Sequence, residues 1–203
     1  MPPIYHITHL DNLPGIIKEG GLHCDRTAQN MKSMNIGHKH IKARRLNRSV
    51  PVGPRGTVGD YVPFYFAPRS PMLFAISRGN VEGYTAGQRP VIYLCSSTEA
   101  VDAAKLRWVF TEGHADMDYT DFFDDFKNLG QIDWSLMRAK YWRDTDEDGD
   151  RKRRRQAEFL VKDFFPWKLV RQIAVYGNDT AKIVSGILVG NTPPIVVEQG
   201  WYY

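Results

Sequence analysis

The chain has 203 residues, of which 42% are hydrophobic, 12% aromatic and 25% charged, and its 27 lysines and arginines against 23 acids give a formal net charge of +4. This composition excludes a disordered chain, a collagen-like repeat and a coiled coil, and the length suits one domain over residues 1–203. No apolar run approaches the ~18 residues of a membrane span and no leader-like segment opens the chain, which predicts a cytoplasmic protein without membrane contact.

The first sixty residues are predicted to form a strand, a helix and a long loop. Residues 4–7 read as a strand, and the following helix has Asp11 or Asn12 as its cap, Pro14 in its first turn and Gly20 after its end. From 25 to 59 there is no sustained apolar period, although 41–48 could form a short cationic helix. A loop of this length in a small domain is usually functional or disordered.

The remaining elements alternate irregularly between strands and helices. The predicted strands are 61–66, 91–94, 108–110, 156–162, 171–176 and 195–197, and the predicted helices are 72–78, 100–105, 119–129, 134–142 and 180–188. This order favours an α+β domain with a mixed sheet over a regular doubly wound one.

Charge is unevenly distributed along the chain. Residues 38–55 contain six lysines and arginines and no acid, whereas acids concentrate between 116 and 150. An acid-free basic segment suits the phosphates of a nucleotide or of a nucleic-acid backbone, and a solvated helix face is an equally good interpretation.

Several familiar motifs are excluded. Residues 144–149 begin like a calcium loop, but the closing twelfth position is Arg155 instead of glutamate. Cys24 and Cys95 are far apart and no third ligand joins the paired histidines, so we expect neither a disulfide nor a metal site. The chain also contains no GxGxxG, P-loop or GxSxG motif.

Three features call for a chemical explanation. Residues 5–9 interleave polar and apolar side chains at a strand end, although His6 could be an ordinary hydrogen-bonded core histidine. Glu158 alternates with apolar neighbours on a predicted strand, which places a carboxylate in apolar surroundings, where acids are often functional; an edge-strand glutamate is the plain alternative. The third feature is the Arg44-Arg45 pair.

These segments, in this order, resemble the DarT family of DNA ADP-ribosyltransferase toxins. The resemblance runs from residue 4 to the C-terminus, and its most specific part is the block from DYVPFYF at 60–66 to SPML at 70–73. The other matching segments are IYHITH with DNL, the residues from Ile41 to Arg45, Phe110-Thr111 with His114, Gln156-Ala157-Glu158 and the final Gly200-Trp201-Tyr202.

The resemblance implies an ADP-ribosyltransferase-like fold with a split mixed β-sheet flanked by helices, and NAD as co-substrate in the cleft. It implies cofactor contacts at His6, Ile7, Thr8, Gly15, His23 and Arg45. The basic loop from about 29 to 47 would fold over NAD, and Glu158 would be the catalytic carboxylate. No metal is implied.

The implied acceptor is thymine N3 in single-stranded DNA. Arg45 matches the family residue that acts on this base, but an arginine is a weak general base, so we expect it to stabilise the deprotonated ring. The expected contacts to the base or strand are Tyr65, Arg69, Met72 and His114, with core packing an alternative for Tyr65 and Met72. The terminal Trp201 to Tyr203 are expected to plug the core.

The resemblance further implies a toxin that acts as a monomer and is neutralised by a macrodomain antitoxin of the DarG kind. Two other functions fit the same residues. One is ADP-ribosylation of guanine, RNA or a protein, and the other is a non-catalytic nucleic-acid-binding module, in which a buried Glu158 would be superfluous.

Overall fold

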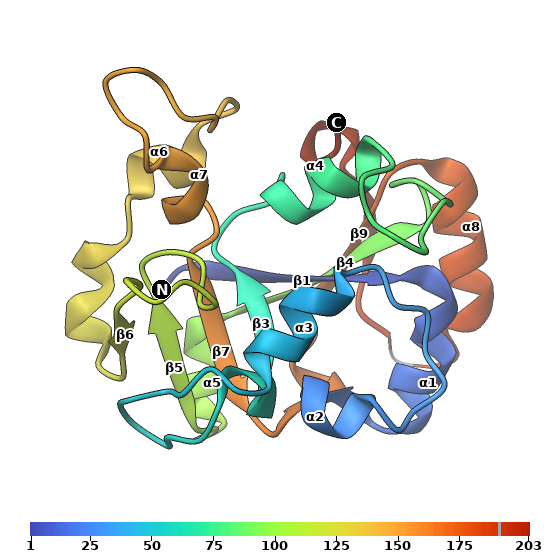
Figure 1. The fold of residues 1–203 in the computed structure, drawn as a ribbon. Coiled ribbons are helices and arrows are strands. Elements are labelled where there is room, and N and C mark those ends of the chain that lie inside the picture. The colour runs from blue at the N-terminus through green and yellow to red at the C-terminus, as the bar shows by residue number, and fades with distance from the viewer. Residues whose placement is uncertain (191) are drawn as a thin grey trace.

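A computed structural model describes residues 1–190 and 192–203. Its main feature is an eight-stranded sheet in the order β10-β9-β4-β1-β3-β7-β5-β6 (Figure 1). The strands are β1 (Pro3–His9), β3 (Tyr61–Tyr65), β4 (Val91–Ser97), β5 (Trp108–Thr111), β6 (Phe122–Phe123), β7 (Glu158–Lys162), β9 (Gln172–Val175) and β10 (Ile195–Val197). The β9–β10 pair is parallel and the others are antiparallel, so the sheet is mixed, as expected.

The sheet is split between β1 and β3. In the described part of the chain, one residue pair, Tyr5 with Tyr65, joins these two strands. By contrast, β1 pairs with β4 along all seven of its residues, from Pro3 to His9. The split divides the sheet into two half-sheets and confirms the expected architecture.

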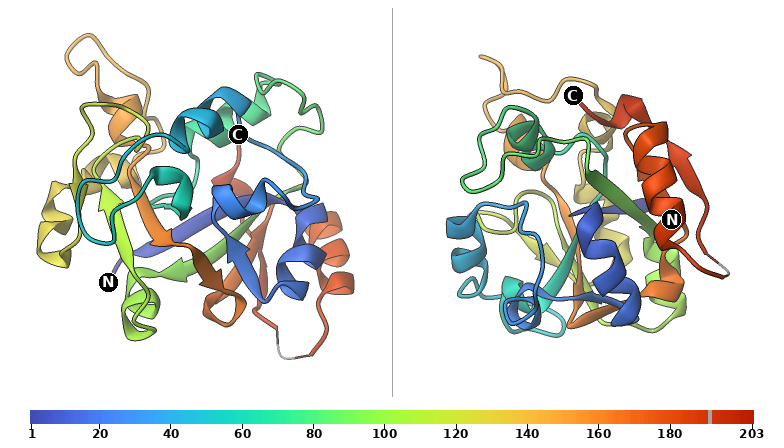
Figure 2. Two further views of the ribbon diagram at one scale, coloured as in Figure 1. Left: turned by 60° about the horizontal axis from the view of Figure 1, so that its bottom comes forward. Right: turned by 90° about the vertical axis from the view of Figure 1, so that its right-hand side faces the viewer.

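Helices cover the half-sheets on both faces (Figures 1 and 2). They are α1 (Leu13–Lys18), α2 (Asp25–Ala28), α3 (Lys39–Arg45), α4 (Pro71–Ser77), α5 (Thr98–Ala103), α6 (Trp134–Arg138), α7 (Arg151–Arg154) and α8 (Asn178–Ile187). In Figure 1, α3 lies in front of the region where β1 and β3 meet. A small two-stranded sheet of β2 (Gly21–His23) and β8 (Phe164–Pro166) was not predicted. No helix in the described ranges is long and apolar enough to span a bilayer.

Local sequence explains the start of α4. The Ser70 hydroxyl accepts a hydrogen bond from the Leu73 backbone N–H at 3.2 Å, and Pro71 occupies the first helical position, where no N–H is needed. The helix then buries Leu73 and Ile76 in one apolar cluster with Tyr93. This cap and apolar face confirm the helix predicted at 72–78.

The helix predicted over 119–129 is wrong. Phe122 and Phe123 instead form β6, and a short 3-10 helix follows at Phe126–Gln131. Phe122 is buried against the core and Phe123 stacks on Phe110 with the ring centroids 5.1 Å apart. Pairing with the edge of β5 lets Phe122 and Phe123 pack into two different apolar clusters, and this packing overrides the helix-like spacing of the aromatics. The helix predicted at 134–142 also ends early, at Arg138.

The predicted C-terminal plug is confirmed. Tyr202 is 3% exposed and donates to the Val91 carbonyl at 2.9 Å, while the Tyr203 hydroxyl donates to the Arg69 carbonyl at 2.5 Å. Trp142 donates to the Tyr203 hydroxyl at 2.7 Å. The tail therefore fastens α4 and the segment before α7 to the sheet.

The charge-rich stretch before β7 is held by arginines. Arg153 binds Glu112 and Asp150, and Arg154 binds Asp133 and Asp148. Arg155 is 3% exposed and donates to the carbonyls of Leu136, Met137 and Pro68. These contacts tie the excursion between β6 and β7 to the start of β7, where Glu158 lies.

Candidate active site

A buried carboxylate and a buried guanidinium face each other beside the split. Glu158 is 3% exposed and Arg45 is 6% exposed. Arg45 Nη1 donates to both Glu158 oxygens, at 3.1 Å to Oε1 and 2.9 Å to Oε2. Burial lowers the pKa of Arg45, but the nearby Glu158 and Asp25 offset this effect, so the pKa is raised and the guanidinium stays charged.

Backbone and hydroxyl groups fix the position of Glu158. The Ala115 N–H donates to Glu158 Oε1 at 3.1 Å, and the Glu158 N–H donates to the Thr111 hydroxyl at 3.2 Å. Glu158 is also the cross-strand partner of Tyr65. Since Tyr65 pairs in turn with Tyr5, the carboxylate lies two strands from the N-terminal β1 segment, on the same rung of the sheet.

The split leaves hydrogen-bonding groups of β1 available. Beyond Tyr5, in the described residues, no strand pairs with the β1 edge that faces β3, so alternate backbone N–H and C=O groups there are free. His6 Nδ1 lies 2.8 Å from the Pro63 carbonyl, which can only accept, so Nδ1 carries the proton and Nε2 is left as an acceptor. Burial lowers the pKa of His6 and keeps the ring neutral.

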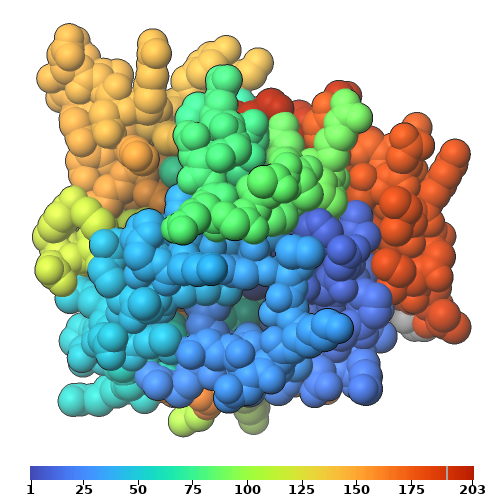
Figure 3. Space-filling model, turned by 45° about the vertical axis from the view of Figure 1, so that its right-hand side comes forward, coloured from blue at the N-terminus to red at the C-terminus, as the bar shows by residue number. Residues whose placement is uncertain are grey.

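The loop between α2 and α3 is fastened over this edge. Asn12 donates to the Thr8 hydroxyl at 3.0 Å and to the Met34 carbonyl at 2.9 Å, and the Met34 N–H donates back to Asn12 at 2.6 Å. At the far end of the loop, Lys42 and Arg45 both face Asp25. Figure 3 shows a hollow on this face, framed by the blue N-terminal segments that include the loop.

One buried donor in the site has no partner. Across the described residues, nothing accepts a hydrogen bond from Arg45 Nη2, although this atom is shielded from solvent. A buried charged donor left unpaired is costly, so its presence beside a fixed carboxylate points to an anionic or carbonyl group of a ligand. The unpartnered Arg45 Nη2 donor, the free β1 edge and the loop fit a nucleotide such as NAD.

Three of the four residues predicted to contact DNA lie near Glu158. Tyr65 donates to the Met72 sulfur at 3.7 Å, and burial together with the charge of Glu158 raises the pKa of Tyr65 above its ordinary range. His114 is one residue before Ala115, and its Nδ1 accepts from the Asp116 N–H at 3.1 Å. That bond puts the proton of the neutral ring on Nε2.

The other predicted site residues lie farther away. Arg69 has a positive φ of 57° and stacks its guanidinium on Tyr203, 4.1 Å from the ring centroid, while donating to the Tyr202 carbonyl. Ile7 packs its side chain into the core, so a ligand would reach only its backbone. Gly15 is exposed in α1, and His23 packs on Phe164 at 4.9 Å between centroids.

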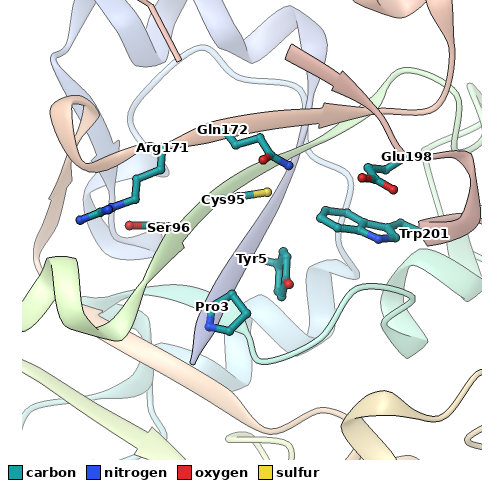
Figure 4. Close-up of a pocket in the computed structure, with 8 residues that line it drawn as sticks. All are labelled: Pro3, Tyr5, Cys95, Ser96, Arg171, Gln172, Glu198 and Trp201. Atoms are coloured by element: carbon teal, nitrogen blue, oxygen red, sulfur yellow. The ribbon is translucent and has the colours of Figure 1, made fainter. Parts of the chain in front are cut away.

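A cavity is lined by the start of β1 and by the C-terminal segment. It has a volume of about 410 Å³ and is lined mainly by β1, β4 and β9 residues with Glu198 and Trp201 (Figure 4). Neither Glu158 nor Arg45 lines it. The candidate active site is therefore the Glu158–Arg45 pair with its unpartnered Nη2 donor, and not this cavity.

Sequence reasoning missed the residues that support the pair. Asp25 faces Arg45 at 3.6 Å, and the Ala115 N–H binds Glu158 through its backbone, which no side-chain pattern reveals. The basic segment also differs from the expected free cationic face, because Lys42, Arg44, Arg45 and Arg48 all face carboxylates.

We expect the stability of the protein to fall as the pH drops below about 6.5, the ordinary pKa of histidine. Burial lowers the pKa of His6 and of His114, so the folded state holds both rings neutral, while the unfolded chain takes up protons below 6.5. Their stabilisation is complete above that pH and is lost as the pH falls through the folded-state values. Urea unfolding at pH 7.5, 6.0 and 5.0 measures the effect.

His114→Asn is the test variant for this pH dependence, because asparagine can still accept from Asp116 but does not titrate. It should lose less stability on acidification than the wild type, while His40→Gln, at an exposed position, should match the wild type. Wild-type stability that stays constant from pH 7.5 to 5.0 would contradict the assignment.

A mixed sheet split between β1 and β3, with a buried glutamate on β7 faced by an arginine from a covering helix, is the arrangement that the resemblance to ADP-ribosyltransferases implies. Comparisons with known proteins agree with this class and narrow it. Residues 5–203 match the family described as "ssDNA thymidine ADP-ribosyltransferase, DarT". A DNA ADP-ribosyl transferase from Thermus aquaticus is 44% identical over 204 residues, covering 98% of this chain and 88% of the relative.

Solved structures are similar along the whole chain. DarT from Thermus sp. 2.9 in complex with ADP-ribosylated ssDNA superposes with a TM-score of 0.93 at 42% identity, covering 100% of this chain and 96% of the other. The same protein with NAD⁺ gives a TM-score of 0.88 at 40% identity, covering 100% and 98%. The chain belongs to the DarT family and is an NAD-dependent DNA ADP-ribosyltransferase.

Proposed function

We propose that the chain transfers ADP-ribose from NAD to N3 of thymine in single-stranded DNA and releases nicotinamide. The observation that carries the proposal is the buried Glu158–Arg45 pair at the split, with Arg45 Nη2 left without a partner. The Thermus sp. 2.9 relative, solved both with NAD⁺ and with ADP-ribosylated ssDNA, supports the two substrates.

Glu158 acts on the ribose. NAD supplies an ADP-ribosyl group whose anomeric carbon becomes positively charged as nicotinamide leaves. The Glu158 carboxylate, fixed by Arg45 and the Ala115 N–H, accepts a hydrogen bond from the ribose and stabilises that charge as it develops. Because its partners already hold it in place, little reorganisation is needed during the reaction.

The β1 edge and its covering loop hold NAD. His6 Nε2, the backbone of Ile7 and the Thr8 hydroxyl lie along the unpaired edge and can bind the nicotinamide amide and its ribose. Gly15 and His23 lie on the neighbouring α1 and β2, where they can line the rest of the nucleotide. Gly15 has open space around it, so backbone approach to a phosphate is unhindered there.

The thymine ring binds on the opposite side of Glu158. Tyr65 and Met72 offer an aromatic face and a polarisable sulfur, and His114 Nε2–H can donate to a thymine carbonyl. As the N3–ribose bond forms and the bond to nicotinamide breaks, the N3 proton passes to solvent. Arg45 stabilises the ring after that loss, since its raised pKa makes it a poor base. Arg69, which packs against the C-terminal tail, is proposed to contact the DNA strand.

Such an activity calls for control, and we propose a DarG-like macrodomain antitoxin as the partner of a monomeric toxin in the cytoplasm. A Thermosipho africanus relative, 24% identical over 203 residues, is named a DNA ADP-ribosyl transferase-DNA ADP-ribosyl glycohydrolase fusion protein, and this chain covers 49% of it. A transferase joined to a glycohydrolase in one relative supports a separate reversing partner here.

The decisive experiment incubates the protein with labelled NAD and single-stranded oligonucleotides that differ at one thymine. We expect mass spectrometry to locate one ADP-ribose on thymine and nicotinamide to appear in equal amount. Binding should weaken as salt rises, because phosphate contacts release counterions. Label found on guanine, RNA or protein would show that the acceptor is that molecule and not thymine. A failure to release nicotinamide under any condition would indicate a non-catalytic binding module.

A further inference from the structure

We infer that Asp116 is a positioning residue that couples NAD binding to DNA binding by fastening α3 to the segment 113–120. This inference rests on the proposed function, because that function assigns the loop leading into α3 to NAD and His114 to thymine. Asp116 itself touches neither substrate. Its effect is exerted through Arg44 and through the backbone on either side of it.

The Arg44–Asp116 contact joins two segments that are 72 residues apart in the chain. Arg44 Nε donates to Asp116 Oδ2 at 2.7 Å, and Arg44 Nη2 lies 2.5 Å from the same oxygen. The Asp116 side chain is 1% exposed, whereas that of Arg44 is 59% exposed. A buried carboxylate thus holds a cation that reaches in from the surface of α3, and charge-assisted bonds of this kind are the stronger ones.

A second arginine from the same side reinforces the contact. Arg48, just after α3, donates to the Asp118 carboxylate at 2.9 Å and to the Asp118 carbonyl at 3.0 Å. It also donates to the Met117 carbonyl at 3.1 Å. Arg44 and Arg48 therefore bind the segment at three successive residues, 116–118.

The segment 113–120 contacts Glu158 and contains His114. His114 accepts from the Asp116 N–H, and the next residue, Ala115, donates to Glu158. Glu158 is bound in turn by Arg45, which is the neighbour of Arg44 on α3. The contacts form a closed ring from α3 through Asp116 and Ala115 to Glu158 and back to α3.

This ring links the binding of the two substrates. When NAD fixes the covering loop, which leads directly into α3, Arg44 and Asp116 pass the constraint to His114, so the thymine side is ordered before the strand arrives. The second oxygen, Asp116 Oδ1, is buried and accepts no hydrogen bond from any described residue, so one carboxylate oxygen carries the whole Arg44 contact. By linkage, DNA must then improve NAD binding by the same factor.

The test measures the affinity for a thymine-containing oligonucleotide by fluorescence anisotropy, with and without saturating carba-NAD, a stable analogue that does not react. In the wild type we expect carba-NAD to tighten DNA binding about tenfold. In Arg44→Gln and in Asp116→Asn the factor should fall to about twofold or less, while the affinity for carba-NAD alone stays within about threefold of the wild type. The double variant should behave as either single one.

Arg44→Lys and Arg107→Gln are the controls. Lysine keeps the charge and should retain part of the coupling, and Arg107 forms an exposed ion pair with Asp163 at the other end of β5 and β7, so its variant should match the wild type. Because Arg44 is exposed, its variants should fold even if Asp116→Asn does not. A wild-type protein without coupling, or single variants with full coupling, overturns the inference, whereas a wild type that releases no nicotinamide overturns the proposed function instead.

Discussion

Replacing Glu158 with glutamine is expected to lower the rate of ADP-ribose transfer by about 10²- to 10³-fold while the fold stays in place. Glutamine has the same shape and can still accept from the Ala115 N–H and Arg45, but it lacks the negative charge that stabilises the ribose. The rate is measured as nicotinamide released with a thymine oligonucleotide, and the fold by thermal unfolding.

Glu99→Gln is the matched control, because Glu99 is exposed in α5 and should leave the rate unchanged. A Glu158→Gln rate within threefold of the wild type would show that Glu158 has no part in the chemistry.

Glu158→Ala differs from Glu158→Gln in its effect on stability. It leaves the buried Arg45 without its main partner, so we expect a loss of stability of about 3–5 kcal/mol in addition to the lost activity.

Replacing Arg45 with glutamine is expected to reduce kcat by about 10²-fold and to weaken carba-NAD binding by less than about tenfold. The larger effect falls on kcat because the proposed role of Arg45 is to hold Glu158 and to stabilise the thymine anion, which exists only during transfer. Stability should also fall by about 3–5 kcal/mol, since Glu158 loses its buried partner. Steady-state kinetics, titration calorimetry and urea unfolding measure the three quantities.

Arg107→Gln is the control for charge removal, because its ion pair is exposed on both sides. If Arg45→Gln changes kcat and carba-NAD affinity by equal factors, Arg45 is a clamp for the cofactor and the stabilisation of the base must be assigned to another donor.

Much of the fold could be predicted because its elements carry local signals. The buried strand at 91–94 and the capped helix at 72–78 both have them, and the structure places β4 and α4 there. The failures have a common cause. The aromatics of 119–129 are spaced as on a helix, but Phe122 and Phe123 pair with β5, a strand that precedes them by a long turn. Contacts between distant segments decide such cases, and no window of sequence contains them.

The site, like the fold, has residues that the sequence reveals and residues that only the folded chain reveals. Glu158 stood out because an acid among apolar strand residues is costly, and Arg45 was found by resemblance. Asp25 and Asp116 could not be found, since their importance comes from arginines of α3 that meet them only in the folded chain. The basic segment suited either phosphate binding or a solvated helix face, yet four of its cations have carboxylate partners. Among the described residues of this segment, Arg45 Nη2 and Arg48 Nε are buried without a hydrogen-bond partner, and of these two arginines Arg45 is the one that binds Glu158.

In the part of the chain that the structure describes, one rung, Tyr5 with Tyr65, joins the half-sheets, and this has a consequence for the stability of the molecule. Few backbone hydrogen bonds join the two half-sheets along this boundary. A molecule bound along the boundary contacts both half-sheets. Bound there as proposed, NAD links the two half-sheets and thereby adds to the stability of the folded chain.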